Sequence, residues 1–130
     1  MSEDLLIDTQ IALWLVRGDE RAMTILGGAV EDPSSTLTMS VASMIEIAIK
    51  HSIGQLRETC DEVRAALLQS GILELQVTSN HASALENLPF HHRDPFDRLL
   101  IAQAQAEDMT FVTADRALVS YRDVVTLRGV

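Results

Sequence analysis

Short apolar runs alternate with helical patterns along this 130-residue sequence, and that alternation restricts the possible folds more than any other feature. Parallel strands need crossover helices, so strands that alternate with helices form a parallel sheet that helices cover on both faces. We therefore predict an α/β fold, a three-layer α/β/α sandwich around a central, mainly parallel sheet of four to five strands. The predicted strands are 5–7, 36–39, 72–77, 110–113 and 124–127.

The segment after the second predicted strand reads as an amphipathic helix that begins after Ser40 and runs to about Ser52. Glu46 lies outside its apolar stripe, so a solvated Glu46 paired with Lys50 is one interpretation of that residue. The residues of the stripe, which we expect to face the core, are Val41, Met44, Ile45, Ala48 and Ile49. Further helices are predicted at 11–16, 20–26, 58–69, 79–87 and 95–104.

The start of the last of these helices is marked unusually well. Asp94 is a good N-cap, Pro95 suits the first helical position, and Asp97 falls at the third position. Two carboxylates therefore meet at one helix N-terminus. Capping and the helix dipole explain them as structural residues, each worth roughly 0.3 to 1 kcal/mol.

Composition limits the range of functions that this chain can have. The net charge of −9 and the pI near 4.7 argue against a protein that holds nucleic acid by bulk positive charge, although divalent cations can neutralise clustered carboxylates. Cys60 is the one cysteine, which excludes a disulfide framework and the usual zinc sites. The mean hydropathy of +0.13 is high for a soluble protein, so either the surface is small relative to the core or a partner covers part of the apolar surface.

We expect one domain over residues 1–130, because neither a linker nor a repeat divides the sequence. The apolar stretch 5–16 is too short and too interrupted to cross a bilayer, and no targeting segment is recognisable. A cytoplasmic location without membrane contact is the expectation.

Carboxylates recur where a ligand site is expected. Right-handed crossovers place the carboxyl ends of parallel strands at one edge of the sheet. Asp8 and Asp115 each follow a predicted strand, Asp97 lies in the first turn of a helix, and Glu46 lies on the helix after the second strand. Carboxylates brought close together repel, and oxygen ligands suit Mg²⁺ or Mn²⁺, ions that promote phosphodiester hydrolysis. Helix capping or surface exposure remains the alternative for each residue alone.

Four segments resemble the PIN-domain toxins of the VapC type, in the same order along nearly the whole chain. The segments are Leu6-Ile7-Asp8-Thr9 with Leu13-Trp14, Ser43 to Lys50 with Gly54-Gln55-Leu56, His92 to Ala104, and Val112-Thr113-Ala114-Asp115. The third is highly specific. Gln10 stands where many relatives carry His, and Ile45 where an aromatic residue is common.

The resemblance implies a PIN-like fold and a Mg²⁺-dependent endoribonuclease, the toxin of a toxin–antitoxin pair. A cognate antitoxin would neutralise it, RNA would be its substrate, and a homodimer is expected. A second copy or an antitoxin helix is the expected cover for Trp14, Leu15 and Val16. By the same resemblance, Thr113 orients the site, and Asp94 serves as the cap or supports the ligands. The catalytic and metal-binding residues that the resemblance implies are Asp8, Glu46, Asp97 and Asp115.

Basic residues near these motifs form the hypothesised rim for the RNA backbone, namely Lys50, Arg57, Arg93, Arg98 and Arg116. Two other functions stay open: a catalytically silent PIN-fold binding module and a Mg²⁺-binding receiver-like domain. The receiver needs an Asp after the middle strand, where this sequence has Thr78, Ser79 and Asn80. Contact with RNA is one interpretation of His91 and His92, and simple exposure as loop residues beside a helix cap is the favoured one.

Overall fold

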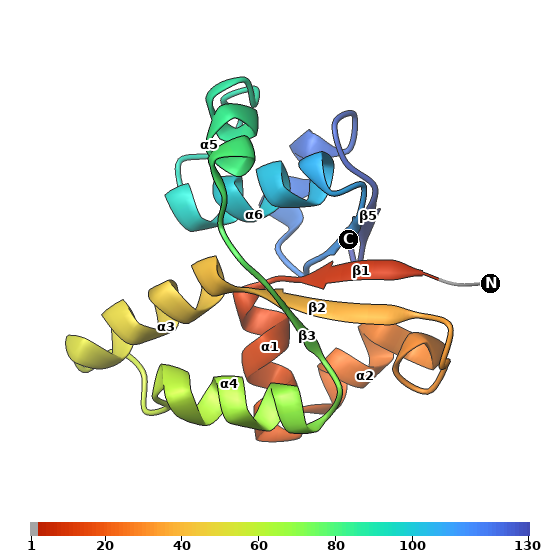
Figure 1. Cartoon of the computed structure of the whole chain (residues 1–130), viewed down its shortest axis with the longest axis vertical. Coiled ribbons are helices and arrows are strands. Elements are labelled where there is room, and N and C mark those ends of the chain that lie inside the picture. The colour runs from red at the N-terminus through yellow and green to blue at the C-terminus, as the bar shows by residue number, and fades with distance from the viewer. Residues whose placement is uncertain (1–2) are drawn as a thin grey trace.

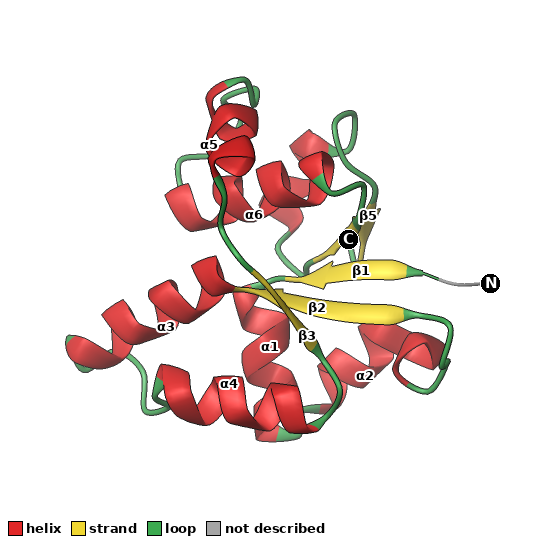
Figure 2. Cartoon of the chain, in the orientation of Figure 1, coloured by secondary structure: helices red, strands yellow, loops and turns green. Residues whose placement is uncertain are grey.

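Five parallel strands form the central sheet of the computed structural model, which describes residues 3–130. The strand order is β3-β2-β1-β4-β5, and β1 pairs with both β2 and β4 (Figures 1 and 2). The bounds are β1 Asp4–Ile7, β2 Thr36–Ser40, β3 Leu73–Leu75, β4 Thr110–Val112 and β5 Leu127–Arg128. The predicted α/β class and parallel sheet are confirmed.

The helices form two layers around this sheet. In Figure 1, α1, α2 and α4 lie on one side of the sheet, and α5 and α6 lie on the other. The bounds are α1 Thr9–Arg17, α2 Glu20–Leu26, α3 Val41–Ser52, α4 Cys60–Gln69, α5 Ser79–Glu86 and α6 Pro95–Ala106, with 3₁₀ helices η1 Gly27–Val30 and η2 Arg116–Tyr121. Within residues 3–130 none of these helices has the length and apolar character needed to span a bilayer.

Side chains along β1 point alternately to the two faces of the sheet, and the core accordingly consists of two clusters. Leu5 and Ile7 pack into the cluster on the α1 and α4 side, whereas Leu6 packs into the cluster on the α6 side. All three side chains are fully buried. The central strand, which directly precedes Asp8, is therefore held from both faces.

Two predicted strands differ from the observed ones by more than one residue at an end. The pairing of β3 covers only Leu73–Leu75, and β5 is a two-residue strand, Leu127–Arg128, that starts later than predicted. Val124 and Val125 instead close a turn, since their N–H groups donate to the carbonyl of Tyr121. An apolar run without a partner strand cannot form the backbone hydrogen bonds of a sheet. Prediction from β propensity alone therefore placed the ends of these two strands wrongly.

The predicted core face of α3 is confirmed at Met44, which is buried, and is wrong at Ile45 and Ile49. Ile45 and Ile49 are each 47% exposed, whereas Glu46 is only 7% exposed. The buried residues of α3 are Ala42, Ser43, Met44, Glu46 and Ile47. Polar Ser43 and Glu46 sit on this face because both meet Thr9 of α1, so tertiary contacts outweigh apolar spacing here.

Candidate metal centre

A cleft of about 580 Å³ opens at the carboxyl edge of the sheet. The structure brings the four predicted acidic residues into its lining, together with Asp94. The complete lining is Asp8, Thr9, Gln10, Leu13, Trp14, Arg17, Arg21, Glu46, Lys50, Asp94, Asp97, Ala114 and Asp115. Carboxylates from four separate parts of the chain therefore share one cleft.

Asp8 directly follows β1 and caps α1. Its carboxylate accepts a hydrogen bond from the N–H of Ile11 at 2.8 Å, and the residue is only 5% exposed. Burial raises the pKa of Asp8 to about 6, and the nearby charges of Glu46 and Asp115 add to this. Hydrogen bonds from the Thr113 hydroxyl and the Ile11 N–H act in the opposite direction and keep the rise smaller.

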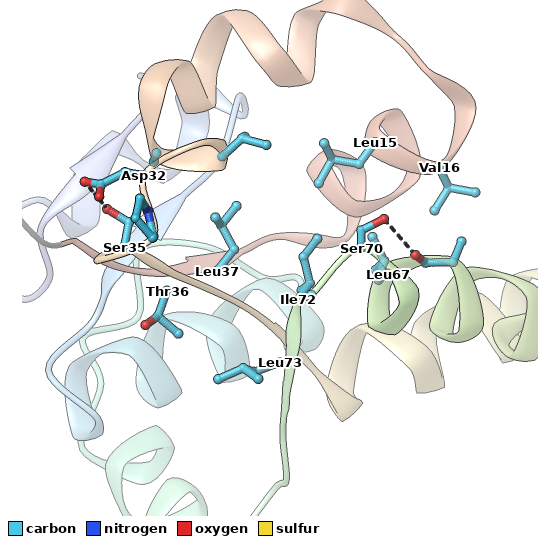
Figure 3. A pocket seen from close by; sticks show the side chains of 15 residues that line it. Leu15, Val16, Asp32, Ser35, Thr36, Leu37, Leu67, Ser70, Ile72 and Leu73 are labelled. Carbon is cyan, nitrogen blue, oxygen red and sulfur yellow. Dashed lines mark hydrogen bonds between the residues drawn. The ribbon is translucent and has the colours of Figure 1, made fainter.

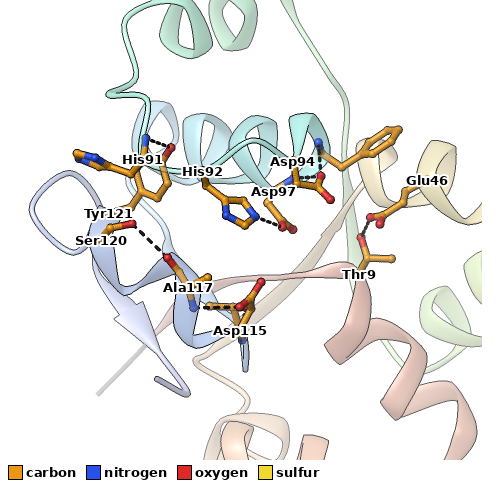
Figure 4. Close-up of polar contacts among 12 residues, drawn as sticks. Thr9, Glu46, His91, His92, Asp94, Asp97, Asp115, Ala117, Ser120 and Tyr121 are labelled. Carbon is orange, nitrogen blue, oxygen red and sulfur yellow. Dashed lines mark hydrogen bonds and ion pairs between the residues drawn. The ribbon is translucent and has the colours of Figure 1, made fainter.

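Glu46 of α3 is held at both carboxylate oxygens. The hydroxyl of Thr9 donates to Oε1 at 2.6 Å (Figure 4), and the ammonium of Lys50 donates to Oε2 at 2.8 Å. The expected pair with Lys50 is confirmed, but Glu46 is buried rather than solvated. Two elements, α1 and α3, thus fix the direction of this carboxylate.

Asp97 projects from the first turn of α6, whose start follows the prediction. Asp94 caps the helix by accepting from the N–H groups of Phe96 and Asp97, and Pro95 takes the first position. Burial raises the pKa of Asp97 to about 6, and the charge of Asp94 contributes next. The helix start therefore carries two neighbouring carboxylates, of which Asp97 is partly desolvated by burial.

His92 is the residue at this site that sequence reasoning missed. Its side chain is 23% exposed, and its Nε2 lies 3.1 Å from a carboxylate oxygen of Asp97. Three residues, His92, Asp97 and Asp115, each offer one possible ligand atom, and these atoms lie within 4.8 Å of one another (Figure 4). A loop has no periodicity, so nothing in the local sequence indicates which way the imidazole faces.

Asp115 and Thr113 follow β4. Asp115 caps η2 by accepting from the N–H of Ala117 at 3.0 Å. The buried Thr113 hydroxyl accepts from the N–H of Asp115 at 3.1 Å and also bonds Asp8. Thr113 therefore connects the ends of β1 and β4, and the orienting role that the resemblance implies for it stays a prediction.

These carboxylates act as caps and still suit a cation. Asp8, Asp94 and Asp115 each cap a helix, as the structural interpretation expects, while all three line the cleft. Burial is the main cause of the raised pKa values of Asp8 and Asp97, and the charges of neighbouring carboxylates add to it. A divalent cation with a preference for oxygen ligands fits this donor set.

The basic lining of the cleft differs from the expected rim. Of the five expected residues only Lys50 lines the cleft, where Arg17 and Arg21 join it. Arg98 lies with its guanidinium 4.9 Å from the centre of the Phe90 ring and donates to the carbonyl of Leu88. Arg57, Arg93 and Arg116 are exposed and lie outside the lining.

A second cavity, of about 570 Å³, lies between α1, α4 and strands β2 and β3 (Figure 3). Apolar side chains such as Leu15, Leu37 and Ile72 line it. Among its described lining residues, Asp32 is the sole ionisable one, and Ser34 and Ser35 donate to its carboxylate. This cavity therefore suits an apolar contact rather than chemistry.

The parallel sheet and the carboxylate-lined cleft at its edge define a class of α/β proteins suited to hold a divalent cation. Residues 5–124 match the family model described as PIN domain, and the chain belongs to this family. The predicted family is thereby confirmed. A search among curated proteins gave no match.

Solved structures agree with this fold. A chain of VapBC2 from Rickettsia felis, bound to a DNA fragment from its promoter, matches with a TM-score of 0.72 at 14% identity, over 95% of this chain and 96% of that chain. VapBC-1 from nontypeable Haemophilus influenzae gives 0.68 at 16% identity, over 95% and 96%. A toxin–antitoxin complex from Klebsiella pneumoniae gives 0.64 at 20% identity, over 94% and 96%.

Asp8→Asn is expected to stabilise the metal-free protein by about 2 kcal/mol at pH 7.5. The folded state holds the Asp8 proton more tightly than the unfolded chain, so ionisation costs stability as pH rises from about 4 through about 6. Asn keeps the cap on α1. Urea denaturation in EDTA measures the difference, which should be present at pH 7.5 and vanish near pH 4.

Asp19→Asn is the matched control for this change. Asp19 also caps a helix, but the hydrogen bond from Arg21 lowers its pKa to about 2. Its ionised form therefore favours folding, and its neutralisation is expected to lower stability at pH 7.5. If both substitutions changed the free energy of unfolding in the same direction, the environment of Asp8 would not be as described.

Proposed function

We propose that this protein is a Mg²⁺-dependent endoribonuclease, with Mn²⁺ as an alternative ion. The convergence of Asp8, Glu46, Asp97 and Asp115 in one cleft carries the proposal. Membership of the PIN domain family and the resemblance to VapC-type toxins support it. Hydrolysis of an RNA phosphodiester bond is the reaction.

The chain's residues take distinct parts in this proposal. Asp8, Asp97 and Asp115 offer carboxylate oxygens to the cation, and Glu46 offers the fourth carboxylate. When bound, a divalent cation lowers the pKa of a water and offsets the charge that develops on the phosphate.

Neighbouring residues hold these carboxylates in position. Thr9 and Lys50 fix Glu46, and Thr113 fixes Asp8 against β4. Asp94 holds the first turn of α6, so that Asp97 faces the cleft. The site is thus built on strand ends and helix starts rather than on free loops.

We also propose that the nuclease is a toxin neutralised by a cognate antitoxin and that it forms a homodimer in the cytoplasm. The similar structures named as toxin–antitoxin assemblies support the antitoxin. The apolar cavity beside Leu15 and Val16 gives an antitoxin segment a surface to cover. The exposed Ile45 and Ile49 of α3, together with Ile53 directly after it, give a second apolar surface for a protein contact.

A circular single-stranded RNA tests the proposed activity. A circle has no ends, so only an endonuclease can linearise it. With Mg²⁺ the purified protein is expected to convert the circle to linear RNA, and a DNA circle of the same sequence is expected to stay intact. A folded protein that binds the RNA circle without cutting it would favour the catalytically silent binding module instead.

A further inference from the structure

One wall of the acidic cleft carries no carboxylate ligand. Gln10, Trp14 and Arg17 lie on successive turns of α1 and all line the cleft, and Arg21 of α2 joins them. With a rise of 1.5 Å per residue, Trp14 lies about 9 Å along the helix from Asp8. This wall is therefore within reach of a nucleotide next to a phosphate held at the carboxylates.

The guanidinium of Arg21 is held in a fixed orientation on this wall. Its Cζ lies 4.2 Å from the centre of the Trp14 ring, which itself packs against the apolar cluster below. The carboxylate of Asp19 holds the guanidinium edge, at 3.1 Å from Nε and 2.7 Å from Nη2. The Arg21 side chain is still 66% exposed, so most of it is open to solvent despite these contacts.

Charge alone explains little of how this cleft would hold RNA. The basic residues in its lining are already paired: Arg17 with Glu58, Arg21 with Asp19 and Lys50 with Glu46. The whole chain carries a net charge of −9. Stacking does not depend on net charge, and unpaired bases stack on aromatic rings and on guanidinium planes.

We propose that Arg21, supported by Trp14 and Asp19, is the platform on which one unpaired base of the RNA stacks beside the scissile phosphate. This inference rests on the proposed function. The planar guanidinium provides the stacking surface, Trp14 sets its height above α1, and Asp19 sets its rotation. The platform positions substrate and takes no part in the chemical step.

Arg21→Lys separates stacking from charge, because lysine keeps the charge and lacks the plane. The variants are made in an Asp97→Asn background so that RNA is bound and not cut. Two probes are compared by anisotropy: a labelled mixed-sequence single-stranded RNA oligomer, and an abasic ribose-phosphate oligomer of the same length. Arg21→Lys is expected to weaken binding of the first by about tenfold and to leave binding of the second unchanged.

Trp14 gives a second readout, because it is the one tryptophan of the sequence. Binding of the base-containing oligomer is expected to change the fluorescence of Trp14, whereas binding of the abasic oligomer is expected to leave it unchanged. Arg64→Lys is the matched control, since Arg64 makes a similar two-point contact with Glu74 outside the cleft. This control should bind both oligomers like the parent.

If Arg21→Lys bound the base-containing oligomer as tightly as its parent does, the platform would be wrong. It would also be wrong if Arg21→Lys lost affinity for both oligomers to the same extent. Cleavage of the RNA circle by the wild-type protein is measured in parallel. If the wild type cleaves and Arg21→Lys binds normally, only the platform is wrong. If the wild-type protein neither binds nor cleaves RNA, the proposed function and the platform are both wrong.

Discussion

Asp97→Asn is expected to lower the rate of RNA cleavage by about 10³-fold or more while the fold survives. Changes next to metal ligands commonly cost 10- to 100-fold, so loss of a ligand carboxylate should cost more. The cap of α6 is Asp94, not Asp97, so the helix start stays intact. Neutralising a carboxyl whose pKa is raised does not remove a stabilising charge. Initial cleavage rates and circular dichroism measure the two effects.

Asp94→Asn is the control for that substitution. It changes a carboxylate of the same cleft, and Asn still caps the helix. We expect a smaller loss, of about tenfold. An Asp97→Asn protein that keeps half of the wild-type rate would contradict the site. Unfolding of that variant would favour the view that Asp97 serves only the helix dipole.

Phe111→Ala is expected to lower the free energy of unfolding by about 4 kcal/mol, a large part of the 5 to 15 kcal/mol typical of a domain. Phe111 is fully buried in β4 and belongs to the cluster that includes Leu100, Ile101 and Tyr121. Truncation leaves a cavity beneath α6 and η2 that rigid neighbouring elements cannot fill. Urea denaturation measures the loss.

Phe90→Ala tests whether burial causes that loss. Phe90 is 69% exposed, so its truncation is expected to change stability by less than about 0.5 kcal/mol. Similar losses for the two phenylalanines would show that the α6 side of the sheet is not packed as described. A large loss for Phe111→Ala alone supports the two-cluster core.

Local signals made much of the fold predictable. Asp94, Pro95 and Asp97 mark the start of α6 because capping and proline geometry act over a few residues. Ser40 marks the start of α3 in the same way. Asp8 and Asp115 follow their strands, so the parallel topology was enough to bring them to one edge.

The rest depends on contacts between distant residues. Glu46 is buried because Thr9, 37 residues away, donates to it, and no local pattern contains that contact. The direction of His92 is set by Asp97 across a loop, and the place of Arg21 in the cleft is set by Trp14 on another helix. These positions depend on the tertiary fold. Prediction from sequence spacing therefore named basic residues that, except for Lys50, do not line the cleft.

Reversible metal dependence of RNA circle cleavage tests the central claim most directly. The protein is incubated with the circle in Mg²⁺, then with EDTA, and then with Mg²⁺ restored in excess. We predict linear RNA in the first and third conditions and an intact circle in the second. Cleavage at the same rate in EDTA would contradict the account, because the grouped carboxylates of Asp8, Glu46, Asp97 and Asp115 would then have no part in the reaction.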